Sequence, residues 1–412
     1  MPLEIAGAGR VEVIVGIPSF GNARTIAHVV STAIRGLSSY FPGSRTLVFN
    51  SDGGSTDGTP DVLRQAAAAT LAELHPGEMR PHVASSRYRG ISGKGSAFRE
   101  IFEVAHGLGA SAVVLLDADL RSVAPDWIAR LALPIVEGRV DYVAPLYRRH
   151  KFDGTITNSI VFPLTDALFG GSVRQPIGGD FGVCGELAEF YAGQDVWNGD
   201  VARFGIDLWM TIHALAGGWR VGQMHLGAKI HDPKDPGQHL AKMLVEVVGT
   251  AFSLIEEHET RWLSGTRAHD AEIFGEPRPV ELPAVEVNVE RMLEQFRFGV
   301  QSLEPVYGSL FDARLRAEID CAARIGDFPD EIWVETILQY IVAFHEHRLP
   351  REQLLASLTP LYLGRTGCFV ARNREATEDE AEERVQGLAR AFRGRVPELI
   401  ARWGSGEKER QP

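Results

Sequence analysis

The chain has 412 residues, of which 44% are hydrophobic and 23% are charged, and its formal net charge at pH 7 is −12. This composition is typical of a soluble globular protein and excludes a disordered or fibrous chain, while the length predicts more than one domain. The acidic balance excludes a protein that wraps nucleic acid or lies on an anionic membrane, because both need a basic face.

The cysteines and the apolar segments indicate a cellular compartment. Cys184, Cys321 and Cys368 are far apart and match no metal-binding spacing, which favours a reducing compartment over a disulfide framework. No apolar segment approaches the roughly 18 to 20 residues needed to cross a bilayer, and the amino terminus lacks the features of a signal peptide. We therefore expect a cytoplasmic protein with no membrane partner.

In the first 145 residues, strand-like apolar runs alternate with helical patterns. After the run 11–17, apolar positions between Ile26 and Leu37 fall on one face of a helix, and Thr59 with Pro60 marks the start of the next helix. This alternation predicts an α/β fold with a mostly parallel sheet and helices on both faces. The expected strands are 11–17, 45–50, 81–85, 112–116 and 141–145.

The rest of the chain predicts further helices and a second domain. Helices are expected at 159–169, 204–218 and 239–257, a strand at 220–226, and only helices from 290 to 401. We expect one domain over 1–260, with a nucleotide-binding half to about 145 and an acceptor half over about 146–260. The remaining parts expected are a linker at 261–288, a helical domain at 289–403 and a disordered tail at 404–412.

Ligands of such sheets bind beyond the carboxyl ends of the strands, so the loops there carry the candidate site. Asp117 and Asp119 follow the strand 112–116, and side chains two residues apart on a strand point to the same side. Two close carboxylates raise each other's pKa unless a cation lies between them, and Mg²⁺ or Mn²⁺ would take their oxygens. The alternative is a helix-capping or solvent-facing pair of aspartates.

Three further residues at strand ends carry chemistry. Asp52 precedes two glycines and could accept hydrogen bonds from a ribose or a base. Lys94 lies between glycines that would leave the backbone free to wrap a phosphate, near the start of a helix. His231 could complete a metal site if the fold brings its loop back to the aspartates. A capped turn, a solvated lysine and a structural histidine are the respective alternatives.

Seven segments in order resemble one enzyme group: PSFGN, DGGSTDGT, GKGSA, LLDADL, QPIGGD, FGID and KIH. They look like a glycosyltransferase with the GT-A fold, and over residues 11–257 they are most similar to retaining enzymes that make mannosylglycerate, glucosylglycerate or glucosyl-3-phosphoglycerate. The resemblance implies an Mg²⁺- or Mn²⁺-dependent enzyme that makes a compatible solute, and the helical carboxyl-terminal domain offers a dimer surface, so we expect a homodimer. Its donor would be UDP-glucose, GDP-glucose or GDP-mannose, and its acceptor D-glycerate or 3-phosphoglycerate.

The resemblance also implies a role for each matching residue. The metal ligands would be Asp117, Asp119 and His231. The residues implied against the nucleotide sugar are Pro18, Ser19, Asp52, Lys94, Ala118, Gly178 and Gly179. The residues implied in catalysis are Lys94, Asp180 beside the transferred sugar, and Asp207 near the acceptor.

The acceptor's acid group needs cationic or hydroxyl partners, which the segment YRRHKFDGTIT offers. The candidates are Arg148, Arg149, Thr155 and Thr157, joined by Asp207, and the alternative is a solvated basic turn. Phosphoglycerate users are expected to have arginine at the position of Thr155, so this chain favours unphosphorylated glycerate.

Three other functions compete with this hypothesis. Asp207 heads a helix where inverting relatives of the fold place a general base, so an inverting transferase acting on another acceptor is an alternative. A sugar-nucleotide pyrophosphorylase usually has a glycine-rich, arginine-containing loop where this chain has PSFGN. A non-catalytic sugar-nucleotide-binding protein would share the fold, because fold does not guarantee turnover.

Overall fold

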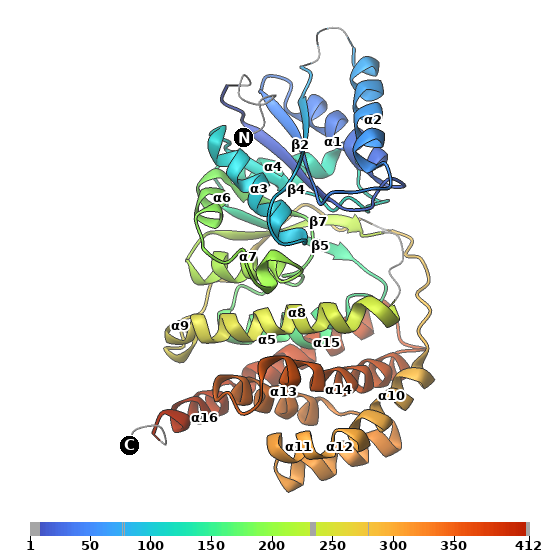
Figure 1. Ribbon diagram of the computed structural model, residues 1–412, viewed down its shortest axis with the longest axis vertical. Helices are drawn as coiled ribbons and strands as arrows, with labels where there is room; N and C mark the ends of the chain where they lie inside the picture. Colours follow the sequence, from blue (N-terminus) through green and yellow to red (C-terminus); the bar gives the residue numbers. More distant parts are fainter. Residues whose placement is uncertain (1–8, 76, 78, 231–235, 279, 409–412) are drawn as a thin grey trace. The chain divides into compact units, whose positions relative to one another are not determined.

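The computed structural model describes the chain except residues 1–8, 76, 78, 231–235, 279 and 409–412 (Figure 1). Its contacts divide the chain into two compact units. The first unit comprises 1–148, 173–234 and 270–282, and the second comprises 149–172, 235–269 and 283–412. The units are interleaved along the chain, whereas the domains expected from the sequence were consecutive segments.

The first unit is built on an eight-stranded sheet with the order β3-β2-β1-β4-β6-β5-β7-β8. β6 pairs antiparallel with both of its neighbours, and the other pairs are parallel. This confirms the predicted α/β class with a mostly parallel sheet. The strands are β1 (Val13–Ser19), β2 (Thr46–Asp52), β3 (His82–Arg87), β4 (Ala112–Leu115), β5 (Tyr142–Arg148), β6 (Phe181–Cys184), β7 (Val221–Ala228) and β8 (Glu272–Phe274).

Helices cover both faces of this sheet (Figure 1). Val13, Val15 and Ile17 of β1 belong to a buried core with residues of α1 and α4, while the intervening Gly16 lies against Ile101 of α3. The strand is therefore buried on both faces, as its continuous apolar sequence predicts. The helices of this unit are α1 (Ile26–Tyr40), α2 (Thr59–Glu73), α3 (Lys94–Gly107), α4 (Asp126–Val136), α6 (Gly185–Ala192), the 3₁₀ helix η2 (Asp200–Ala202) and α7 (Ile206–Ala216).

The second unit is helical in the part that the structure describes, apart from an isolated bridge between Gly170 and Ala268. This confirms the predicted helical carboxyl-terminal region. Its helices are the π-helix η1 (Thr157–Val161), α5 (Phe162–Phe169), α8 (Pro236–Glu257), α9 (Glu259–Leu263), α10 (Val289–Ser302), α11 (Glu304–Leu310), α12 (Ala313–Ile325), α13 (Asp330–His345), α14 (Arg351–Arg372), α15 (Glu378–Gly394) and α16 (Val396–Lys408).

Three expected segments differ from the structure. The segment 149–172, expected in the acceptor half, joins the helical unit because α5 packs against α15. The expected linker contains α9 and β8, and β8 pairs with β7 at the sheet edge. A disordered tail was expected from residue 404, whereas α16 extends to Lys408; the residue before the expected tail, Trp403, is buried and packs on Trp262 and His345.

α14 is long and apolar enough to cross a membrane by length and composition. However, 67% of its apolar window is buried inside the protein. It also carries the buried Arg365, which donates to Asp330 Oδ1 at 2.5 Å. These properties are typical of a core helix.

Candidate functional site

Five charged side chains form a cluster in the first unit, beyond the carboxyl end of β4. Lys94 Nζ lies 2.8 Å from Asp117 Oδ1 and 3.0 Å from Asp207 Oδ1. Lys229 Nζ lies 2.7 Å from Asp117 Oδ2 and 2.8 Å from Asp180 Oδ2. Asp117 therefore has an ammonium group on each carboxylate oxygen, and three carboxylates are paired with two lysines.

The topology of the sheet brings these residues together from distant parts of the sequence. Asp117 follows β4, and Asp180 precedes β6, the antiparallel neighbour of β4. As a result, the backbone N–H of Asp117 donates to Asp180 Oδ1 at 2.8 Å. Lys94 begins α3, Asp207 lies in the first turn of α7, and Lys229 follows β7. The predicted meeting of strand-end residues at one edge of the sheet thus occurs for this group.

The cluster is largely removed from solvent. The side chain of Asp180 is 0% exposed and that of Lys229 is 5% exposed, and burial raises the pKa of Asp180 and of Asp207 against the opposing effect of their lysines. Burial alone would lower the pKa of Lys94, but the charges of Asp117 and Asp207 outweigh it and raise this pKa. An unpaired buried charge is costly. The ion pairs within the cluster therefore stabilise each of its buried charges.

Sequence reasoning missed Lys229. The segment KIH drew attention to its histidine, although Lys229 stands directly at the end of β7, where the sheet delivers functional side chains. Its ammonium also donates to the carbonyl oxygen of Gly178 at 2.8 Å, while Lys94 donates to the carbonyl of Gly179 at 3.2 Å. Both lysines therefore hold the glycine loop that leads to Asp180.

The glycines of QPIGGD allow this loop to lie against the cluster. Gly179 has a φ of +92°, and a Cβ atom there would lie 2.3 Å from Asp117 Oδ2. A Cβ atom at Gly178 would lie 2.2 Å from Cγ of Pro145. The expected contact of these glycines and Asp180 with a transferred sugar stays a prediction.

The glycines around Lys94 pack closely on the neighbouring backbone, and their expected contact with a phosphate stays a prediction. A Cβ atom at Gly95 would lie 1.9 Å from the carbonyl oxygen of Val201, and one at Gly93 would lie 2.4 Å from that of Ala202. The Gly95 N–H also donates to the carbonyl of Arg203 at 3.2 Å. The glycines thus allow the start of α3 to pack closely on the backbone of residues 201–203. The helix begins at Lys94 itself.

We expect Gly95→Ala to lower the free energy of unfolding by roughly 2 kcal/mol or more, because the added methyl group meets a backbone carbonyl that has little room to move. Gly199→Ala is the matched control, since nothing lies within 4 Å of a Cβ atom there. Chemical denaturation of both variants measures the effect. Equal stability of the two would contradict the packing described for Gly95.

The carboxylate of Asp52 accepts four hydrogen bonds, which hold the turn after β2. Its Oδ1 accepts from the backbone N–H groups of Gly54 at 2.8 Å and Ser55 at 2.7 Å. Its Oδ2 accepts from the hydroxyls of Ser19 at 2.8 Å and Ser55 at 2.7 Å. The side chains of Asp52 and Ser19, both expected against a nucleoside, are therefore engaged with each other, next to Pro18 in β1. Their nucleoside contacts stay a prediction.

We expect Asp52→Asn to destabilise the protein by about 1 to 3 kcal/mol, because an amide NH₂ in place of one oxygen faces donors instead of accepting from them. Thermal unfolding measures the stability, and the change in unfolding temperature on adding a nucleoside diphosphate measures the nucleotide affinity. If Asp52 serves the turn alone, the variant loses stability and keeps its nucleotide affinity. Loss of affinity with unchanged stability would support the direct nucleoside contact instead.

The residues expected at the acceptor are split between the units. Arg148 ends β5 and is exposed in the first unit, whereas Arg149, Thr155 and Thr157 belong to the second. Within the second unit, the Thr155 hydroxyl lies 2.5 Å from the Tyr362 hydroxyl, and Arg149 donates to Asp153 at 3.2 Å. Thr157 is buried at the start of η1. Their acceptor role stays a prediction.

The predicted metal ligands are only partly described. His231 lies outside the described residues. Asp117 does not fit an open metal ligand in this arrangement, because both of its oxygens hold lysine ammonium groups. Asp119 is half-buried and offers the carboxylate oxygens that Mg²⁺ and Mn²⁺ prefer. Between the two aspartates, the buried Ala118 accepts a hydrogen bond from Thr25 at 2.7 Å through its carbonyl.

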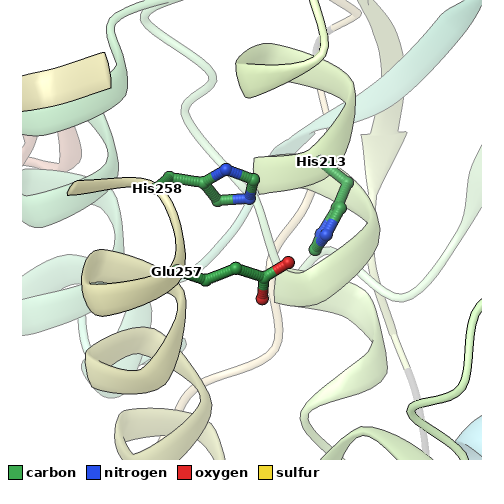
Figure 2. Close-up of side chains that lie close together, drawn as sticks. All are labelled: His213, Glu257 and His258. Atoms are coloured by element: carbon green, nitrogen blue, oxygen red, sulfur yellow. The ribbon is translucent and has the colours of Figure 1, made fainter. Parts of the chain in front are cut away.

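Other histidines have packing roles inside their own units. His213 on α7 bonds the Trp209 carbonyl at 2.9 Å, and their rings are 4.3 Å apart between centroids. In the second unit, His258 follows Glu257 at the end of α8 and packs edge-on against Phe169. Figure 2 draws His213, Glu257 and His258. The cluster described above includes none of them.

Comparison with known proteins gives one family and a set of solved structures. Residues 14–172 match the family model Glycosyl transferase family 2. No curated protein matches this chain.

Glucosyl-3-phosphoglycerate synthase from Mycobacterium tuberculosis is among the similar structures. Its complex with Mn²⁺, UDP and phosphoglyceric acid is 22% identical, with a TM-score of 0.44, and the match covers 61% of this chain and 80% of that one. Its complex with Mg²⁺ and UDP is 21% identical, with a TM-score of 0.43 and the same coverage. A further structure of this enzyme is 24% identical, with a TM-score of 0.43, over 61% of this chain and 83% of that one.

Proposed function

We propose that this chain, a glycosyltransferase with the GT-A fold whose residues 14–172 match glycosyl transferase family 2, moves glucose or mannose from a nucleoside-diphosphate sugar to D-glycerate or 3-phosphoglycerate. The observation that carries the proposal is the buried cluster of Asp117, Asp180, Asp207, Lys94 and Lys229. It lies beyond the carboxyl ends of the strands, where ligands of such sheets bind, and its members Lys94 and Asp117 fall within the matched residues.

The proposed reaction breaks the bond between the anomeric carbon and the diphosphate oxygen, joins that carbon to the oxygen of an acceptor hydroxyl, and passes the hydroxyl proton to the departing diphosphate. Negative charge grows on the departing diphosphate, so groups that stabilise it act on the transition state. Lys94, the more exposed of the two lysines, would be the cation that faces that charge. Asp180 and the Gly178–Gly179 loop would orient the sugar, because fixed geometry supplies much of the rate in group transfer.

We propose Mg²⁺ or Mn²⁺ as the cofactor, held by Asp119 and His231. Such an ion supplies charge neutralisation at the diphosphate when bound. Asp117 would then serve mainly as the shared counter-ion of Lys94 and Lys229, with both oxygens engaged at 2.8 and 2.7 Å. In the first unit, Arg148 would be the cationic partner of the acceptor's acid group.

The stereochemical outcome we propose is retention. The inverting alternative is favoured by one observation, since Asp207 is buried at the head of α7 and burial raises its pKa, a property of general bases. Against it, the Asp207 carboxylate is paired with the Lys94 ammonium, which lowers its basicity. The anomeric configuration of the product, read by NMR, decides between retention and inversion.

A donor-by-acceptor screen tests the proposed function. UDP-glucose, GDP-glucose and GDP-mannose are each combined with D-glycerate and 3-phosphoglycerate, with Mg²⁺, Mn²⁺ or a chelator. We expect transfer with one donor and one of the two acceptors, and its loss with the chelator. Release of a nucleoside triphosphate from pyrophosphate and a sugar nucleotide would instead support a pyrophosphorylase. Donor binding with no transfer across the panel would support a sugar-nucleotide sensor.

A further inference from the structure

We propose that Lys229 is a positioning residue of the transferase site, whose buried ammonium fixes the carboxylates of Asp117 and Asp180 and the Gly178–Gly179 loop in the arrangement that receives the donor sugar. The proposal rests on the proposed function. It assigns a task to a residue that sequence reasoning left without one.

The ammonium group of Lys229 donates hydrogen bonds to three protein groups. An ammonium group has three N–H donors and no acceptor. Lys229 Nζ donates to Asp117 Oδ2 at 2.7 Å, to Asp180 Oδ2 at 2.8 Å and to the Gly178 carbonyl at 2.8 Å. Three protein acceptors thus hold its ammonium group, and its side chain is only 5% exposed, against 14% for Lys94. Because of this deeper burial, Lys229 acts on the site through its neighbours and not by touching substrate.

The two lysines divide the cluster between them. Lys94 is 14% exposed and bonds Asp117, Asp207 and the carbonyl of Gly179, whereas Lys229 is more deeply buried and bonds the opposite oxygen of Asp117. Asp117 is therefore fixed on both sides. Loss of Lys229 would release one side of it and the Gly178 end of the loop together.

The carboxylate of Asp180 has Lys229 as its ion-pair partner among the described residues. Its Oδ1 accepts from the Asp117 N–H at 2.8 Å, and its Oδ2 accepts from Lys229 and from the Tyr147 hydroxyl. Without Lys229, the carboxylates of Asp117 and Asp180 would lie close together in a buried region with no cation between them. This arrangement is unfavourable because like charges repel and buried charges need partners. Asp180 or Asp117 would then move, and the loop that carries Gly179 would move with it.

Kinetics of Lys229→Met test the proposal, since this variant keeps an unbranched side chain and removes the charge. We expect the donor KM to rise about tenfold and kcat to fall about 100-fold, the scale of a misplacement of about 1 Å, with the acceptor KM within about twofold of wild type. Lys229→Arg should recover part of the loss because it keeps the charge. Arg220→Met is the matched control, because it removes the ion pair with Asp141 in the same unit and should leave the kinetics unchanged.

A purely structural role predicts a different result. In that case Lys229→Met loses stability, while the donor KM and kcat of its folded fraction match wild type, and this outcome overturns the proposal. Should Lys229→Met not fold, the pair Asp180→Asn and Lys229→Met/Asp180→Asn gives the same comparison without the unpaired carboxylate. A donor affinity that is weaker in the double variant than in Asp180→Asn supports positioning, and an equal affinity overturns it.

Titration calorimetry with UDP-glucose, GDP-glucose and GDP-mannose separates this proposal from the proposed function. Wild-type protein that binds none of these donors would defeat the proposed function itself. Wild-type protein that binds a donor, with Lys229→Met binding it equally well and turning it over equally fast, would defeat only the role of Lys229. Weaker donor binding by Lys229→Met than by Arg220→Met would support it.

Discussion

Asp119→Ala is expected to abolish metal-dependent sugar transfer and to leave the protein folded. Asp119 is half-buried beyond the end of β4, and among the described residues the carboxylate partners of Lys94 and Lys229 are Asp117, Asp180 and Asp207. Loss of a cation that neutralises a leaving diphosphate costs several kcal/mol in the transition state, so we expect kcat/KM to fall on the order of 10³-fold or more.

Mn²⁺ binding by calorimetry and transfer rates over a range of Mn²⁺ concentrations measure this effect. Asp117→Ala is the informative comparison, because it leaves two lysines without their shared counter-ion and should lose stability as well as activity. An Asp119→Ala protein with wild-type Mn²⁺ affinity and turnover would remove Asp119 from the metal site.

The fold of the first unit could be predicted where the sequence signal is local. Strand periodicity, helix starts such as Thr59 with Pro60, and the alternation of the two element types each depend on residues close together in the chain. The strand β6 was missed because it has four residues in a glycine-rich segment, and β8 because it has three. The membership of 149–172 in the helical unit depends on packing of α5 against α15, more than 200 residues away in sequence.

The candidate site, like the fold, could be predicted only where the sequence signal is local. The sequence identifies Asp117, Lys94 and Asp207 as charged residues near strand or helix ends, but it contains nothing that pairs Lys94 with a carboxylate 113 positions later. Lys229 was overlooked because a lysine before a histidine has no distinctive pattern. Asp52 was correctly placed at a strand end, yet its four hydrogen bonds to the turn depend on how two neighbouring strands end together.

Lys94→Met is expected to have the other large effect, on both activity and stability. The substitution leaves Asp207 without its described cationic partner and Asp117 with Lys229 alone, and breaking a buried pair by removing one member costs about 3 to 5 kcal/mol. It also removes the cation that we place opposite the departing diphosphate, so kcat/KM should fall by about 10³-fold. Chemical denaturation and transfer assays measure the two effects separately.

The double variant Lys94→Met/Asp207→Asn distinguishes the two roles of Lys94. Neutralising Asp207 removes the unpaired carboxylate and should recover most of the lost stability, because the cost lies in the uncompensated charge. It cannot restore a cation to the diphosphate, so transfer should stay about 10³-fold below wild type. Recovery of transfer together with stability would mean that Lys94 serves only to balance Asp207, and the positive charge facing the leaving group would then have to come from another residue.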